Sequence, residues 1–178
     1  MLSRDMPCHG EPEGRVVPAE LPPVIDTHVH VFPDTIFSAV RSWFDAHAWH
    51  IRYQMKTREV FEFLLSRGLA HIVACQYAHK PGMAPELNAY MARQCQAFKG
   101  RVTGLATVFP GEKGSRDILQ KAFDAGLKGV KLHIHVQCFD MNSPAMAPVY
   151  AVCRDNGMPL LIHAGREPKS EAYACDPY

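Results

Sequence analysis

Residues 24–33 read VIDTHVHVFP, and this stretch indicates both a strand and the chemistry at its end. An apolar, β-branched run leads into His28 and His30 and then meets Pro33. Successive side chains of a strand point to opposite faces, so the two imidazoles share one face. Neutral imidazole is a good ligand for a divalent metal ion. The stretch therefore predicts a metal site, with two partly solvated histidines at a strand end as the alternative.

The rest of the chain alternates between β-rich runs and helical stretches. We predict strands at residues 21–31, 71–77, 102–109, 129–136 and 159–162. We predict helices at residues 35–50, 57–67, 85–98, 115–125 and 144–156. Strands that alternate with helices of this length are typical of βαβ units and a parallel sheet. The expected fold class is therefore α/β.

The number of strands bears on the architecture. A (β/α)₈ barrel needs eight strands and typically about 250 residues, whereas these 178 residues supply about five βα units. The chain is then either a smaller open sheet or a TIM-barrel-like fold that stops early, and residues 174–178, which follow the fifth strand in a loop, favour truncation. We expect a disordered leader at residues 1–20, rich in Pro, Gly and charge, and a partial barrel domain at residues 21–178.

Composition excludes several classes of partner. The chain is 47% hydrophobic and 21% charged with a net charge of +1, and it has no basic stripe for nucleic acid and no polybasic segment for a membrane surface. No apolar run approaches the roughly 20 residues of a membrane span. Six scattered cysteines without a Cys-x-x-Cys pair indicate reduced thiols in a cytoplasmic protein. We expect a small-molecule substrate, and a homo-oligomer is left open.

Further histidines follow at the ends of the fourth and fifth predicted strands. Parallel α/β folds build their sites at the C-terminal ends of strands, where His133 and His163 should meet the first pair. His163 ends an apolar run and precedes Ala-Gly, which places its imidazole at the rim. We predict His28, His30 and His163 as metal ligands, with a satisfied core histidine as the alternative for His163.

Two cationic side chains accompany the histidines. Lys131 and His133 share one face of the fourth strand, and His135 continues that face. Three roles are open for Lys131: it bridges two metal ions after carboxylation, it binds an acidic substrate, or it forms a structural ion pair. Two roles are open for His133: it contacts the substrate or a metal-bound water, or it is structural. Arg166 either clamps a substrate carboxylate or is an exposed loop residue. A metal-bound water needs a general base, and no carboxylate stands at a predicted strand end as an obvious candidate.

Three segments together, residues 24–30, 126–133 and 159–165, resemble the amidohydrolase superfamily. The nearest likeness is to the amidohydrolase-related (amidohydrolase family 2) metal-dependent hydrolases, which include decarboxylases of the aminocarboxymuconate-semialdehyde type. The resemblance covers about residues 22–178 and implies a distorted (β/α)₈ barrel with one divalent metal, Zn²⁺ first and Mn²⁺ as an alternative. It implies His28, His30 and His163 as ligands. The family's strand-six histidine and strand-eight aspartate have no counterpart in this sequence.

Three functions follow as hypotheses. The first is a metal-dependent hydrolase, in which metal-activated water attacks a C–N, C–O or activated C–C bond, with Lys131 and His133 as catalytic residues. The second is a metal-dependent decarboxylase acting on a carboxylate-bearing substrate. The third, from another class, is a truncated, non-catalytic fragment or binding module. A sequence beyond Tyr178 that holds a His-x-Gly strand and a later strand ending in Asp would favour the enzymes.

Overall fold

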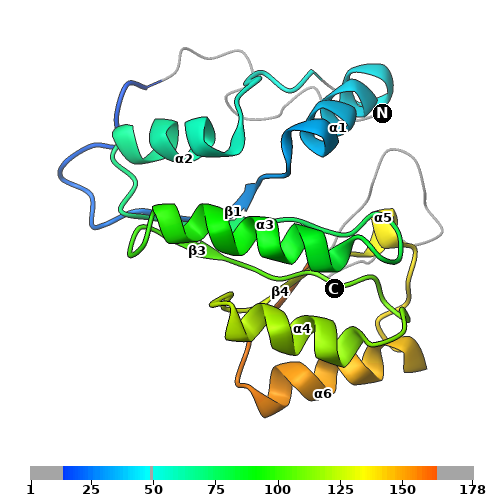
Figure 1. Ribbon diagram of the computed structural model, residues 1–178. Coiled ribbons are helices and arrows are strands. Elements are labelled where there is room, and N and C mark those ends of the chain that lie inside the picture. Colours follow the sequence, from blue (N-terminus) through cyan, green and yellow to red (C-terminus); the bar gives the residue numbers. More distant parts are fainter. Residues whose placement is uncertain (1–13, 49, 164–178) are drawn as a thin grey trace.

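Parallel strands alternate with helices throughout the part of the chain that the computed structural model describes, residues 14–48 and 50–163 (Figure 1). The strands are β1 (Ile25–His30), β2 (His71–Cys75), β3 (Val102–Gly104), β4 (Val130–His133) and β5 (Leu160–His163). The helices are α1 (Asp34–His47), α2 (Thr57–Ser66), α3 (Ala84–Ala97), α4 (Ser115–Asp124), α5 (Ile134–Gln137) and α6 (Ala147–Asp155), and a 3₁₀ turn, η1, spans Pro144–Met146. The expected α/β class is confirmed.

The strands are neighbours in the order of the sequence. β1 pairs with β2, β2 with β3, and β4 with β5, all in parallel. Ala106 joins the two sheets, because its N–H donates to Gly129 O and its carbonyl accepts from Lys131 N–H, each at 2.8 Å. Parallel pairing brings every strand's C-terminal end to the same edge, so residues at those ends lie close together although they are far apart in sequence.

The core lies between the strands and the helices α3, α4 and α6, which pack along one side of the sheet (Figure 1). Ile72, Val130 and Leu132 of the strands are fully buried against it. At Gly104 a Cβ atom would come within 2.7 Å of Met91 Cγ and of Cys95 Sγ on α3. Only glycine therefore lets α3 pack this closely on β3. In the described residues, no helix is long and apolar enough to cross a membrane.

One predicted element differs in a way that matters for the site. The predicted strand 129–136 ends at His133, where the chain turns into α5. The His133 N–H donates to the side chain of Gln137 at 2.8 Å, and Cys138 closes α5 with a φ of 50°. The prediction that His135 continues the strand face was therefore wrong, because His135 lies on α5.

Residues 14–17 of the N-terminal segment are hydrogen-bonded to Arg67, at the end of α2. Residues 14–20 contain no helix or strand, and Val17 N–H donates to Arg67 O at 2.7 Å. The Arg67 guanidinium in turn donates to the carbonyls of Gly14 and Arg15. Residues 1–13, residue 49 and residues 164–178 lie outside the described part of the chain, so the extent of the leader and of the domain stays a prediction.

Candidate metal centre

The first pair of histidines converges at the end of β1. His28 Nε2 and His30 Nε2 are 3.0 Å apart, and their ring centroids are 4.8 Å apart. The pairing of β1 with β2 shifts register between Asp26 and Val29, and Asp26 Oδ1 accepts a hydrogen bond from His28 N–H at 3.0 Å. His28 is exposed and His30 is half-buried. The two nitrogens are thus close enough for one cation to contact both.

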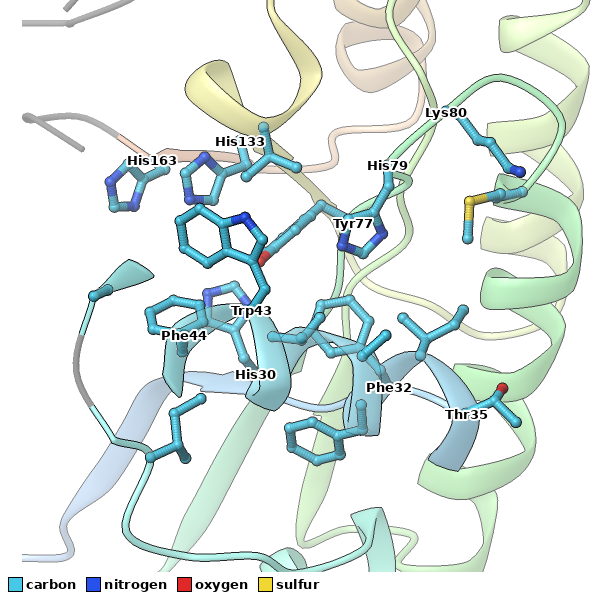
Figure 2. A pocket seen from close by; sticks show the side chains of 18 of the residues that line it. His30, Phe32, Thr35, Trp43, Phe44, Tyr77, His79, Lys80, His133 and His163 are labelled. Atoms are coloured by element: carbon cyan, nitrogen blue, oxygen red, sulfur yellow. The ribbon is translucent and has the colours of Figure 1, made fainter. Parts of the chain in front are cut away.

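The second pair comes from β4 and β5. His133 and His163 are direct partners in the parallel register, and their rings stack with centroids 4.1 Å apart and planes 9° apart. Tyr77, just after β2, links the two pairs: its ring lies 5.3 Å from that of His30 and 4.9 Å from that of His133. Figure 2 shows His133 and His163 side by side, with Tyr77, Trp43 and His30 nearby.

Lys131 lies fully buried beneath these histidines. Within the described residues its Nζ atom has no hydrogen-bond partner. Burial lowers the pKa of Lys131, because the ammonium loses its hydration. The absence of a described partner disfavours the structural ion pair among the roles predicted for this lysine.

The same environment keeps the imidazoles neutral. Burial, followed by repulsion from neighbouring charged groups that include Lys131, lowers the pKa of His30 to about 3, of His133 to about 2 and of His163 to about 4. Burial and Lys131 also lower the pKa of His28. Neutral imidazole carries the lone pair that a metal ion requires, so these histidines are in a protonation state suited to ligation.

A cavity of about 1020 Å³ opens at this edge of the strands. The sheet side of its wall comprises His28, His30, Tyr77, His133 and His163. The opposite wall is the apolar face of α1, with Ile36, Phe37, Val40, Trp43 and Phe44 (Figure 2). Among the described residues that line it there is no carboxylate. One wall of the cavity is therefore rich in imidazoles and the other is apolar.

The donor set fits a divalent metal ion. One donor atom each from His28, His30 and Cys75 lies within 4.8 Å of the others. His163 lines the same cavity from β5. Three imidazoles suit Zn²⁺, and a nearby sulfur does not exclude it. The prediction of His28, His30 and His163 as ligands stays a prediction: all three line one cavity, but among the described residues His163 is not part of the group whose donor atoms lie within 4.8 Å of one another.

Sequence reasoning missed several residues at this edge. No role in the site is predicted from the sequence for Cys75 or His79, yet Cys75 contacts His30 and His79 lines the cavity. Tyr77 and His79 follow directly on β2, so the rule that strand ends build sites could have found them. Arg166 lies outside the described residues.

Comparison with known proteins identifies the family. A family model described as Amidohydrolase matches residues 25–177. The chain belongs to the amidohydrolase family. Its structural neighbours are TIM-barrel amidohydrolases, which confirms the barrel-like α/β class. Comparison with curated protein sequences gave no match.

Several solved structures share this fold at low sequence identity. 5-Carboxyvanillate decarboxylase from Novosphingobium aromaticivorans, complexed with manganese and 4-hydroxy-3-methoxy-5-nitrobenzoic acid, is 18% identical with a TM-score of 0.62, over 88% of this chain and 55% of that one. An amidohydrolase II is 17% identical with a TM-score of 0.64, over 84% and 53%. 4-Oxalomesaconate hydratase from Rhodopseudomonas palustris is 16% identical with a TM-score of 0.50, over 79% and 52%. The chain thus spans about half the length of these structures.

Proposed function

We propose that this chain carries the metal-binding strand ends of a metal-dependent hydrolase. The observation behind the proposal is that three neutral histidines, from β1 and β5, line one cavity above the buried Lys131. His28, His30 and His163 would hold the metal. A bound divalent metal lowers the pKa of a water molecule toward about 7 and polarises a carbonyl group. The bond attacked would be C–N, C–O or activated C–C.

Zn²⁺ is the metal we propose, with Mn²⁺ as the alternative. Imidazole nitrogen and a nearby sulfur favour Zn²⁺ over harder cations. Manganese is present in the 5-carboxyvanillate decarboxylase structure, which shares this fold. The discriminating measurement is competition between the two ions for the purified protein.

Lys131 and His133 would act on the substrate. A carboxylate entering the cavity would supply the partner that the buried Lys131 ammonium lacks among the described residues. This observation favours the substrate-binding role over carboxylation or a structural ion pair. His133 stacks on His163, and in the described part of the molecule its Nδ1 has no hydrogen-bond partner. It could therefore contact substrate or water. Arg166 stays a prediction as a second carboxylate-binding residue.

A second candidate, a metal-dependent decarboxylase, is favoured by the cavity's charge. No carboxylate lines the cavity in the described part of the chain to take a proton from water, whereas Lys131 would bind a substrate carboxylate. Two enzymes whose solved structures share this fold are decarboxylases: 5-carboxyvanillate decarboxylase, with a TM-score of 0.62, and 2,6-dihydroxybenzoate decarboxylase, with a TM-score of 0.51. A small carboxylate-bearing molecule is the proposed substrate in either case.

The deciding experiment combines metal analysis with a substrate panel. Protein purified without chelator should carry about one divalent metal per chain. The loaded protein is then offered amides, esters and aromatic carboxylates. Release of amine or alcohol supports the hydrolase, and release of CO₂ supports the decarboxylase. Metal binding without turnover supports a binding module instead, and protein that binds no metal contradicts both enzyme functions.

We also propose a cytoplasmic location. Cys75, Cys95, Cys138 and Cys153 are free thiols in the described part of the structure, as expected in a reducing compartment. Labelling of thiols in cells, with and without prior reduction, would test this proposal. Homo-oligomerisation stays a prediction, which sedimentation would test.

A further inference from the structure

Cys75 lies beside the proposed metal ligand His30 because of the register between β1 and β2. It is the last residue of β2 and the direct partner of His30 in the parallel pairing with β1. The Cys75 carbonyl accepts a hydrogen bond from Val31 N–H at 3.0 Å, which fixes the two strand ends relative to each other. Cys75 is fully buried, so its side chain is confined to this contact region.

The two ring nitrogens of His30 face different neighbours. His30 Nε2 is 3.0 Å from His28 Nε2, whereas His30 Nδ1 is 3.7 Å from Cys75 Sγ. A metal ion held by both histidines through the nitrogens that approach each other would contact His30 Nε2. The sulfur lies at the other nitrogen of the ring, away from that contact.

The tautomer of His30 decides whether this nitrogen is available. A neutral imidazole carries one proton, on either Nδ1 or Nε2. A proton on Nε2 blocks the lone pair that a metal needs, whereas a proton on Nδ1 leaves it free. Metal-binding histidines commonly donate their second N–H to a neighbouring acceptor, which fixes the tautomer and the ring orientation. Among the described residues, Cys75 is the hydrogen-bond partner of His30 Nδ1.

We propose that Cys75 is a positioning residue, whose sulfur accepts a hydrogen bond from His30 Nδ1–H and thereby presents His30 Nε2 to the metal. This inference rests on the proposed metal site. In the metal-free protein, His28 Nε2–H then donates to His30 Nε2, which accounts for the 3.0 Å separation of those atoms. His28 is exposed, so it can change its own tautomer in contact with solvent when metal binds.

The first test reads the tautomer directly in the metal-free protein. Long-range ¹H–¹⁵N correlation spectra distinguish a protonated from an unprotonated ring nitrogen. Wild-type His30 should be protonated on Nδ1. In the Cys75→Ala variant, which lacks the acceptor, the population protonated on Nε2 should increase. Protonation of wild-type His30 on Nε2 would overturn the inference, whether or not the protein binds a metal.

The second test measures Zn²⁺ affinity by competition with a chromogenic chelator. Cys75→Ala should weaken Zn²⁺ binding about tenfold, at the lower end of the effect of removing an outer hydrogen-bond partner. Cys75→Ser, whose hydroxyl can accept the same bond, should retain most of the affinity and also serves if the alanine variant does not fold. Cys153→Ala is the matched control, because it removes a buried sulfur from α6 and should leave affinity unchanged.

The outcomes separate this inference from the metal site itself. If wild-type protein binds no Zn²⁺, the proposed function fails, while the tautomer of His30 still tests the role of Cys75. If wild type and Cys75→Ala bind Zn²⁺ equally well, the metal site stands and the role of Cys75 is refuted. Loading with Co²⁺ provides the last check, since a sulfur-to-cobalt charge-transfer band would make Cys75 a direct ligand and overturn the positioning role.

Discussion

Replacement of Lys131 by methionine should stabilise the metal-free protein. Lys131 is fully buried, and its Nζ atom has no hydrogen-bond partner among the described residues. An unsatisfied buried polar group costs about 1–3 kcal/mol, and more when it is charged. Methionine has a similar length and no polar atom, so it recovers this cost without leaving a cavity. We therefore expect the free energy of unfolding to rise by about 1–3 kcal/mol.

Urea denaturation in the presence of a chelator measures this gain. For an m-value of about 2 kcal/mol/M, the unfolding midpoint should rise by roughly 0.5–1.5 M. Lys128→Met is the matched control, because Lys128 is exposed on the same segment and its replacement should change stability by less than about 0.5 kcal/mol. A midpoint for Lys131→Met equal to or below that of wild type would refute the reasoning, because it would mean that the ammonium is satisfied in the folded chain.

The pH dependence of the same variant gives an independent check. Burial lowers the pKa of Lys131 below its ordinary value of 10.5, so the folded chain releases this proton at a lower pH than the unfolded chain does. Between the two pKa values the unfolded state binds more protons, and stability therefore rises with pH. The stability advantage of Lys131→Met over wild type should be complete below the folded pKa and shrink as pH rises toward 10.5. An advantage that grows with pH would contradict the assignment.

Three further outcomes are expected. Lys131→Met should bind a carboxylate ligand about 10–100-fold more weakly in calorimetry, since a hydrogen bond to a charged group contributes about 1.5–3 kcal/mol; undiminished binding would argue against the substrate role. His163→Ala should weaken Zn²⁺ binding at least about 100-fold with little change in helical circular dichroism. His71→Ala, at the end of β2 away from the site, should leave Zn²⁺ affinity unchanged. Burial lowers the pKa of His79, so wild type should lose stability relative to His79→Phe as pH falls from 6.5 through the pKa of His79 in the folded state. A difference between the urea midpoints of the two proteins that is the same at neutral and acidic pH would contradict this.

The order of the strands could be predicted from the sequence because it depends on local patterns. Apolar runs that alternate with amphipathic stretches specify βα units, and parallel neighbours follow from that alternation. The end of β4 could not be predicted in this way. Ile134 and Val136 extend a β-like pattern, but the side chain of Gln137 accepts a hydrogen bond from His133 N–H, and that contact accompanies a turn into α5. A hydrogen bond of this kind leaves no periodic signal.

The candidate site likewise contains residues that the sequence alone could predict and others that only the structure reveals. His28, His30 and His163 stand at strand ends, where position alone indicates function. The importance of Cys75 depends on its register against His30, which is a property of two strands and not of either sequence segment. The apolar face of α1 is visible in the sequence as a helical repeat, but the pattern does not say whether that face covers a core or, as here, a cavity.

The charge of the site explains why metal and substrate should be considered together. Among the described residues, the cavity is lined by imidazoles, by Lys80 and by no carboxylate, and Lys131 is fully buried two residues before His133 on β4. Burial first, and then positive charge from neighbouring groups that include Lys131, lower the pKa values of four histidines, and a divalent metal adds further positive charge to this region. An anion that contacts both the metal and Lys131 would offset this excess of positive charge. This balance of charge supports the proposal that the metal-loaded site binds an anionic group on an apolar body.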